Sequence, residues 1–260
     1  MLSAMDRSLS GLIARQAMID VAADNIANIN TTAFKKNEAI FGELLYDSLR
    51  VRRGPVIGGE TVQSGRGVKI AALTKNQLQG SLSPSESRTN LAIQGKGFFR
   101  VSDGRGNVFY TRAGTFQLDS EGNFVTPGGE YLEPRLELDV EKIDPRSLRI
   151  SPAGQVSGLS YDGEDVSLGK ISLYYFTNSA TLRPLAGGLL AYAPAAGAIE
   201  VGSPGEGGLG TIQQGFQEES NVNLAQELVN LIRAQRSLQA NARALTTAEE
   251  LWALSLYQPS

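Results

Sequence analysis

Residues 2–26 read LSAMDRSLSGLIARQAMIDVAADNI, and their apolar positions recur at alternating intervals of three and four residues. This interval is the a/d repeat of a coiled-coil seam, in which one stripe of a helix packs against a partner. Proline is absent and Gly11 is the only glycine, so the stretch predicts a long N-terminal helix. The predicted seam consists of Leu2, Met5, Leu9, Leu12, Gln16, Ile19, Ala23 and Ile26.

The C-terminal residues repeat the same pattern, and Asn223 with Gln226 resembles a capping box at its start. Each seam holds one central glutamine, Gln16 or Gln235, and a polar seam residue fixes register at a cost in stability. The alternative is two amphipathic helices on one globular core. A seam at each end favours helices that pair with each other or with other chains. The predicted C-terminal seam consists of Leu224, Leu228, Leu231, Gln235, Leu238, Ala242, Leu245, Glu249, Trp252 and Leu256.

Nearly all glycines and prolines lie between the two predicted helices. Strand-like runs at 91–101, 108–111 and 171–177 alternate with turn formers, which predicts a small antiparallel sandwich or irregular barrel. The expected fold is therefore α+β: terminal helices that pair as a coiled coil, discontinuous around a central, mostly antiparallel all-β domain.

This pattern divides the chain into four predicted parts. Residues 1–45 form an N-terminal helical segment, and 46–75 form an extended basic connector with six basic and two acidic side chains. Residues 76–204 form the β domain. Residues 205–260 form a C-terminal connector and a helix that pairs with 1–45.

The composition excludes most chemistry. The chain has 260 residues, a net charge of -3, and neither histidine nor cysteine. Imidazole bases, cysteine nucleophiles and thiolate or imidazole metal sites are therefore impossible, and a nucleic-acid binder would be more basic. The glycine-rich stretches lack phosphate-binding spacing. We expect no catalytic residue, cofactor or metal; a carboxylate-dependent hydrolase is the remaining enzymatic alternative.

Targeting signals are also weak. No apolar stretch reaches the roughly 20 residues of a membrane-spanning helix. Asp6, Arg7 and Arg15 interrupt the N-terminus, which argues against a cleavable secretory signal.

Three motifs occur in order along the chain. The first is ADNIANINTTAFK at 23–35, the second is NLAIQGKGFF at 90–99 with YTRAGTF at 110–116, and the third is QGF at 214–216 with ESNVN at 219–223. Together they resemble the bacterial flagellar axial proteins of the rod and hook family. The residues that carry the resemblance are Asn25, Asn28, Thr31, Phe34, Lys35, Gly95, Gly97, Phe98, Phe99, Tyr110, Arg112, Gly114, Phe116, Gly215, Ser220, Asn221 and Val222.

The first motif also predicts the local structure at several of its residues. Asn25 and Asn28 should cap and turn the helix end, with contact to a neighbouring subunit as the alternative. Ala33 stands where the family usually has glycine; if that glycine has positive φ, Ala33 must accept strain or adopt another turn.

Successive strand residues face opposite sides, so of Phe98 and Phe99 one should be core and the other available to an interface. The motif residues Tyr110, Arg112 and Phe116 are expected to pack within a hairpin.

The resemblance implies a structural subunit, not an enzyme, which polymerises helically into a hollow drive shaft that transmits torque to the hook and filament. Its implied partners are further copies, neighbouring rod and hook proteins, and the surrounding bushing ring, without nucleic acid or membrane insertion. The implied location is the basal body, extracytoplasmic in the periplasm, after export without a cleavable signal peptide.

Chain length and the long basic connector favour the distal rod. A proximal-rod or hook subunit is the alternative within the family. Outside it, the alternative is a secreted binding module borne on a coiled coil.

Overall fold

The computed structural model describes residues 2–44, 46–49, 62–65, 67–136, 138, 142–162 and 164–256. The chain divides into two compact units. Unit 1 comprises Met1–Ala27, Asn37–Lys75 and Asn223–Ser260, and unit 2 comprises Asn28–Lys36 and Asn76–Val222.

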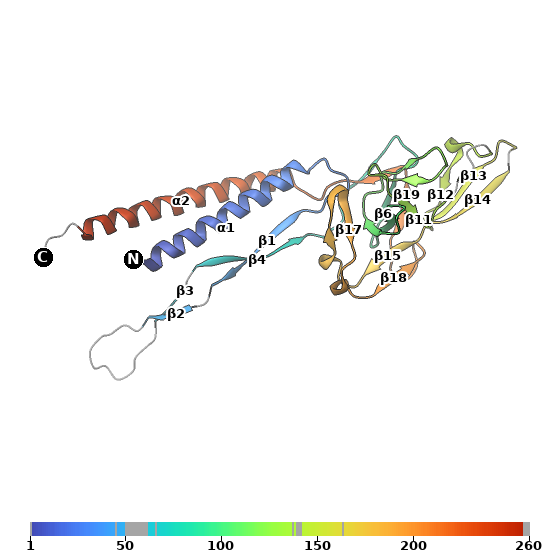
Figure 1. Cartoon of the computed structure of the whole chain (residues 1–260). Coiled ribbons are helices and arrows are strands. Elements are labelled where there is room, and N and C mark those ends of the chain that lie inside the picture. Colours follow the sequence, from blue (N-terminus) through green and yellow to red (C-terminus); the bar gives the residue numbers. More distant parts are fainter. Residues whose placement is uncertain are drawn as a thin grey trace. The chain divides into compact units, whose positions relative to one another are not determined.

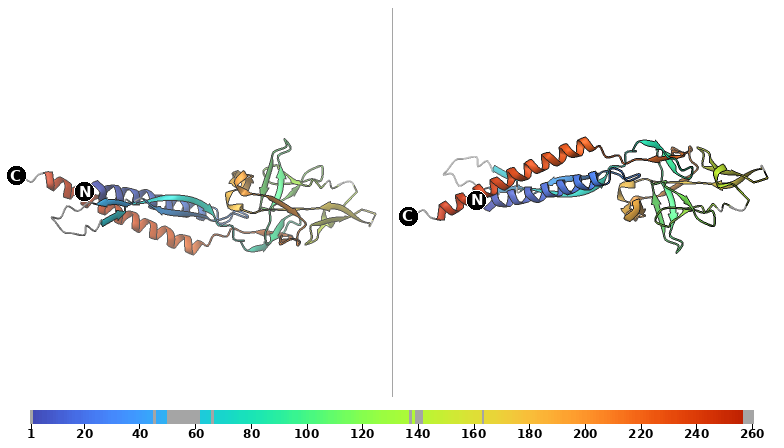
Figure 2. Two further views of the ribbon diagram at one scale, coloured as in Figure 1. Left: turned by 90° about the horizontal axis from the view of Figure 1, so that it is seen from below. Right: turned by 90° about the horizontal axis from the view of Figure 1, so that it is seen from above.

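Unit 1 is built on two long antiparallel helices, α1 (Leu2–Ala27) and α2 (Leu224–Leu256), which lie side by side (Figures 1 and 2). Asn223 caps α2 as expected, because its side-chain oxygen accepts a 3.1 Å hydrogen bond from the Gln226 amide. Among the described helices, none has both the length and the apolarity needed to cross a membrane.

Small side chains allow the two helices to approach closely. Ala14, Ala22 and Ala234 are buried, and a Cβ atom added to Gly11 would lie 2.8 Å from the side-chain nitrogen of Asn241. The fold class is thus confirmed at the level of terminal helices around an antiparallel β region.

Two antiparallel strand pairs complete unit 1. Of these strands, β1 and β4 pack against α1, and the Val68 amide donates to the Ser10 hydroxyl. The pairs are β1 (Asn37–Glu43) with β4 (Val68–Lys75), and β2 (Tyr46–Leu49) with β3 (Val62–Gly65). The predicted connector 46–75 therefore contains β2, β3 and β4, while its residues 50–61 lie outside the described residues.

Unit 2 contains the remaining strands, and all pairings described there are antiparallel. Its largest sheet has seven strands in the order β16-β17-β8-β7-β11-β10-β9. These strands are β7 (Phe99–Ser102), β8 (Val108–Thr111), β9 (Gln117–Leu118), β10 (Phe124–Val125), β11 (Tyr131–Glu133), β16 (Arg183–Pro184) and β17 (Leu189–Ala191).

Unit 2 also contains four smaller sheets. The pairs are β6 (Leu91–Gln94) with β19 (Thr211–Gln214), β5 (Leu82–Pro84) with β20 (Phe216–Glu218), and β15 (Leu173–Phe176) with β18 (Ile199–Gly202). The remaining sheet has β13 (Gln155–Leu159) between β12 (Arg149–Ile150) and β14 (Asp165–Lys170). Residues 205–222, expected with the C-terminal helical part, lie in unit 2 because β19 and β20 pair with β6 and β5.

Two apolar clusters form the interior of unit 2. Phe99 packs in the larger cluster, where its ring meets Phe116 edge-on at 5.4 Å. Phe98, on the opposite strand face, packs in the second cluster with Tyr110 and Phe176. Both phenylalanines are buried within one chain, so the expectation that one of them is available to an interface is wrong.

Candidate functional site

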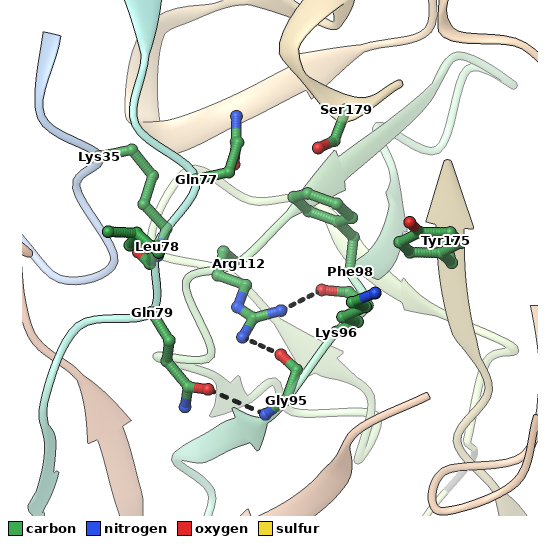
Figure 3. Close-up of a pocket in the computed structure, with 11 residues that line it drawn as sticks. Lys35, Gln77, Leu78, Gln79, Gly95, Lys96, Phe98, Arg112, Tyr175 and Ser179 are labelled. Atoms are coloured by element: carbon green, nitrogen blue, oxygen red, sulfur yellow. Dashed lines mark hydrogen bonds between the residues drawn. The ribbon is translucent and has the colours of Figure 1, made fainter. Parts of the chain in front are cut away.

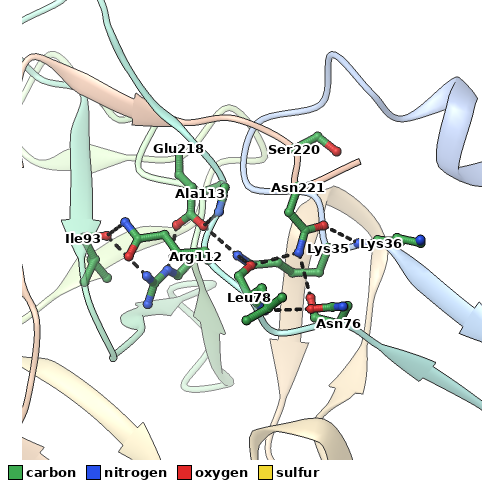
Figure 4. Close-up of polar contacts among 12 residues, drawn as sticks. Lys35, Lys36, Asn76, Leu78, Ile93, Arg112, Ala113, Glu218, Ser220 and Asn221 are labelled. Atoms are coloured by element: carbon green, nitrogen blue, oxygen red, sulfur yellow. Dashed lines mark hydrogen bonds and ion pairs between the residues drawn. The ribbon is translucent and has the colours of Figure 1, made fainter. Parts of the chain in front are cut away.

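A buried carboxylate joins the three sequence motifs within unit 2. The Glu218 side chain has no solvent exposure, and its two oxygens lie 2.6 Å from Lys35 Nζ and 2.7 Å from Arg112 Nε (Figure 4). Lys35 ends the first motif, Arg112 belongs to the second, and Glu218 lies between the two stretches of the third. Residues separated by as many as 183 positions thus meet at one ion-pair cluster.

A strained turn brings Lys35 to this cluster. The Thr31 amide donates to the Asn28 carbonyl at 3.1 Å, which confirms that Asn28 belongs to the turn after α1. Ala33 has φ 56°, the left-handed conformation that glycine adopts more easily. Its amide donates to the Glu218 carbonyl at 2.7 Å, so backbone and side chain of Glu218 both hold this turn.

Arg112 links the cluster to the loop that follows β6. Its guanidinium donates to the carbonyl oxygens of Ile93, Gly95 and Gly97, as well as to Glu218. Arg112 was expected to pack within a hairpin, and its contacts extend well beyond one. It fixes the path of the Gly95–Gly97 loop and the position of the buried carboxylate together.

The electrostatics explain why the cluster remains ionised. Burial alone would raise the pKa of Glu218, but the adjacent charges of Arg112 and Lys35 outweigh burial and hold that pKa below its ordinary value. Burial lowers the pKa of Lys35, and Glu218 only partly offsets this effect. Two cations share one carboxylate, so the cluster carries a net positive charge. Because both Glu218 oxygens are hydrogen-bonded, this geometry suits structural support better than proton transfer.

A second polar residue joins the same stretches of chain. Asn221 accepts a 2.8 Å hydrogen bond from the Lys36 amide and donates to the carbonyls of Asn76 and Leu78. We call residues 33–36, 76–80 and 218–221 the collar. Each of these stretches leads along the chain toward unit 1, and all three are held together inside unit 2.

A pocket of about 340 Å³ opens beside the collar (Figure 3). Lys35 and Leu78 lie on its collar side, and the loop from Gly95 to Phe98 lies opposite. Arg112 lies between them. Among the described residues, no group of three or more metal-ligating side chains comes together anywhere.

The other motif residues have mainly structural contacts. Asn25 is fully buried and exchanges hydrogen bonds with the backbone of Asn37, which ties the end of α1 to the start of β1. At Gly114, a Cβ atom would lie 1.6 Å from the Leu91 carbonyl oxygen, so only glycine fits. Ser220 accepts a hydrogen bond from the amide of Val222, next to the collar.

Both helices turn only part of their predicted seams toward each other. The positions that meet inside the chain are small or polar: Asn25 hydrogen-bonds to Glu227, and Gly11 lies close to Asn241, with buried Ala234 between these two positions of α2. Half-buried seam residues are Leu12, Ile19, Ile26, Leu231, Leu238 and Leu245. Exposed seam residues are Leu9, Gln16, Ala23, Leu224, Leu228, Gln235, Ala242 and Glu249. The side chains of Leu2, Met5, Trp252 and Leu256 lie outside the described residues.

Sequence reasoning missed Glu218 as the centre of the site. Glu218 and Glu219 are adjacent, and the sequence does not distinguish the buried carboxylate from the exposed one. The available signal was a pair of cations, Lys35 and Arg112, each directly next to or close to aromatic residues of a motif, because cations that become buried need a buried anion.

Family models of the flagellar axial proteins match three parts of the chain. The Flagella basal body rod protein model matches residues 5–35, and the Flagellar hook protein FlgE/F/G D1 domain model matches residues 92–158. The Flagellar basal body rod FlgEFG protein C-terminal model matches residues 213–254. Each match includes one of the residues that meet at the cluster.

Similar proteins extend over nearly the whole chain. The flagellar basal-body rod protein FlgG of Agrobacterium fabrum is 35% identical over 93% of this chain and 94% of its own length. FlgG of Bacillus subtilis is 34% identical over 96% of this chain and 97% of its own length. The hook protein FlgE of Helicobacter mustelae matches only 55% of this chain and 33% of its own length. The chain therefore belongs to the family of flagellar basal-body rod proteins.

Proposed function

We propose that the chain is a structural subunit of the distal flagellar rod, which polymerises helically through the outward faces of α1 and α2. The rod assignment rests on the relatives named FlgG, and the distal assignment rests further on chain length and the long connector. The subunit would have no catalytic role and no cofactor.

One observation carries the proposed mode of assembly. Large apolar side chains of the helices remain exposed although the helices pair within the chain. Leu9 is 53% exposed and Ile13 is 60% exposed on α1, while Leu228 and Ile232 on α2 are 45% and 48% exposed. The two residues of each pair are four positions apart and therefore neighbours on one helix face, and clustered apolar exposure of this kind marks an interaction surface.

The exposed and buried residues indicate that two faces of each helix make different contacts. The small and polar face serves the pair within one chain, and the exposed apolar residues on each helix, among them Leu9, Ile13, Leu228 and Ile232, serve contacts with other copies. We propose that coiled-coil packing occurs between subunits through these exposed residues. A patch that contacts a different patch on the next copy generates a helical filament when the rotation does not close.

The wider setting follows from this assignment. The partners would be further copies, adjoining rod and hook proteins, and the bushing ring around the shaft. The location would be the basal body in the periplasm, reached by export without a cleavable signal peptide.

Sedimentation of the concentrated full-length chain tests the proposal. We expect Leu228→Ser with Ile232→Ser to abolish polymer while leaving helix content unchanged, because both side chains are exposed in the monomer. The matched control is Gln239→Ser, an exposed polar position on the same helix. Equal polymer yield from the double variant and the control would overturn the assembly surface.

A further inference from the structure

The pocket beside the collar has an unusual charge balance. Its described lining includes Lys35, Lys96 and Arg112 but no carboxylate (Figure 3). Glu218 pairs with Lys35 and Arg112 and is not part of the lining. The three cations and this one carboxylate sum to a formal charge of +2, so the pocket attracts negative charge.

The cations are placed differently within the pocket. Lys35 and Arg112 are 8% and 9% exposed, and their polar contacts hold them in fixed positions. Lys96 is exposed and lies with its ammonium 5.6 Å from the centre of the Tyr175 ring. Among the described residues, Lys96 forms no ion pair. An anion can therefore approach Lys96 without displacing another partner.

The remaining walls fit a peptide. Leu78 is 71% exposed, and Tyr175 adds an aromatic surface, while Gln77 and Ser179 offer hydrogen bonds. A volume of about 340 Å³ is at the lower end of the range of small-molecule pockets, about 300–1,000 Å³. Such a pocket accommodates a loop tip with one or two side chains.

The same unit displays a complementary loop. The tip between β13 and β14 carries exposed Asp162, Glu164 and Asp165, and the ring of Tyr161 is 67% exposed. No basic residue occurs from 159 to 169. Within the described part of the chain, these three carboxylates form no ion pair. The hairpin lies at the end of unit 2 beyond β6 and β15 (Figure 1).

We propose that the pocket receives the acidic β13–β14 tip of a second copy of the chain. Asp162 or Glu164 would lie against Lys96, and Tyr161 would pack beside Leu78 and Tyr175. Because charge complementarity selects partners and fixes their register, this contact would orient the β units of adjacent copies. The inference rests on the proposed self-assembly and adds a second interface to the helical one.

Charge reversal of both partners tests this contact in the full-length chain. We expect Lys96→Glu to raise the critical concentration for polymerisation about 3- to 10-fold, and Asp162→Lys with Glu164→Lys to act similarly. All three residues are exposed, so folding should be preserved. Combining the three substitutions should return the critical concentration to within about 2-fold of wild type, because the pair is restored with opposite signs.

The matched control is Arg105→Glu, the same change of charge at an exposed turn of the same unit, which should leave the critical concentration unchanged. Additive effects of the pocket and tip variants, or an equal effect of Arg105→Glu, would overturn the contact while leaving the rod assignment intact.

A titration independent of polymerisation separates the two proposals. The probe is a synthetic peptide with the sequence of residues 159–166, LSYDGEDV, added to the soluble full-length chain. It should shift the amide resonances of Gly95, Lys96 and Gly97 in a saturable way, and Lys96→Glu should abolish the shift. An LSYNGQNV peptide that binds equally well, or no binding by either peptide, would contradict the docking site even if the chain forms rods.

Discussion

Glu218 stabilises unit 2 more than its single charge suggests, because two buried cations depend on it. Glu218→Gln keeps the shape but removes the anion, which leaves Lys35 and Arg112 without a counter-charge. Breaking a buried pair in this way costs about 3–5 kcal/mol. We expect a loss of that size in the free energy of unfolding, measured by urea denaturation with near-ultraviolet circular dichroism. The neighbouring exposed Glu219→Gln should change stability by less than about 0.5 kcal/mol.

Lowering the pH should show the contribution of the Glu218 carboxylate to the free energy of unfolding. Its pKa is held below the ordinary value of 4.5, so the folded state binds this proton less readily than the unfolded state. The stabilisation is therefore present in full above pH 4.5 and disappears as pH falls through the lowered folded-state pKa. Urea denaturation at pH 7 and at acid pH should show a steeper loss for wild type than for Glu218→Gln. Parallel pH profiles would mean that Glu218 is not the titrating group.

Ala33 offers a prediction of the opposite sign. Its φ of 56° costs an L-amino acid about 1–2 kcal/mol, whereas glycine adds about 0.5–1 kcal/mol of unfolded-state entropy. Ala33→Gly should thus stabilise the chain by up to about 1.5 kcal/mol, measured as a rise in the denaturation midpoint. Ala195→Gly is the control: Ala195 is exposed and lacks positive φ, so the change should destabilise. A destabilised Ala33→Gly variant would mean that the turn carries no strain.

Residue-level prediction succeeded where chemistry is local. The Asn223 cap and the special turn at Ala33 depend on a few adjacent residues, and both could be read from the motif. The role of Glu218 depends on Lys35 and Arg112, which are distant in sequence. A single sequence does not specify which carboxylate reaches them.

At the scale of elements, the spacing of apolar residues predicted both helices. It did not predict which face of each helix is buried against the other. In α2, the face toward α1 includes Glu227 and Ala234, each one residue before the predicted seam positions Leu228 and Gln235. Intervals of three and four residues describe adjacent stripes equally well when small residues flank the large ones. Which stripe is buried depends on how closely the partner helix approaches. Small residues such as Gly11 and Ala234 permit that close approach.

The buried and the exposed stripe of α1 should respond differently when a larger side chain is introduced. Ala14→Leu overfills a buried position on α1 and should lower the free energy of unfolding by about 1–3 kcal/mol, seen in thermal unfolding by far-ultraviolet circular dichroism. Ala23→Leu on the exposed stripe should alter monomer stability by less than about 0.5 kcal/mol. Equal destabilisation by the two substitutions would show that both stripes are buried in the monomer.

The order of strands in the sheets could not be predicted from the sequence, because it too depends on contacts between distant parts of the chain. Alternation and turn formers predicted strands, yet β6 pairs with β19 and β8 pairs with β17, both far away along the chain. Such pairings are selected by packing of the whole core rather than by turns. The same long-range pairings place residues 205–222 in unit 2.

At the scale of the whole molecule, the chain separates its internal contacts from those proposed between copies. Unit 1 pairs its helices through small residues and leaves large apolar side chains exposed. Unit 2 holds its collar together through Glu218 and Asn221. The exposed apolar side chains are thus available for the proposed contacts between copies.

Electron microscopy of the concentrated or seeded full-length chain tests this account most directly. The account predicts straight, stiff, hollow tubes from the wild-type chain, and only dispersed particles from Leu228→Ser with Ile232→Ser. Wild-type chains that keep folded helices and yet remain monomers, or that close into small rings, at every concentration would contradict it.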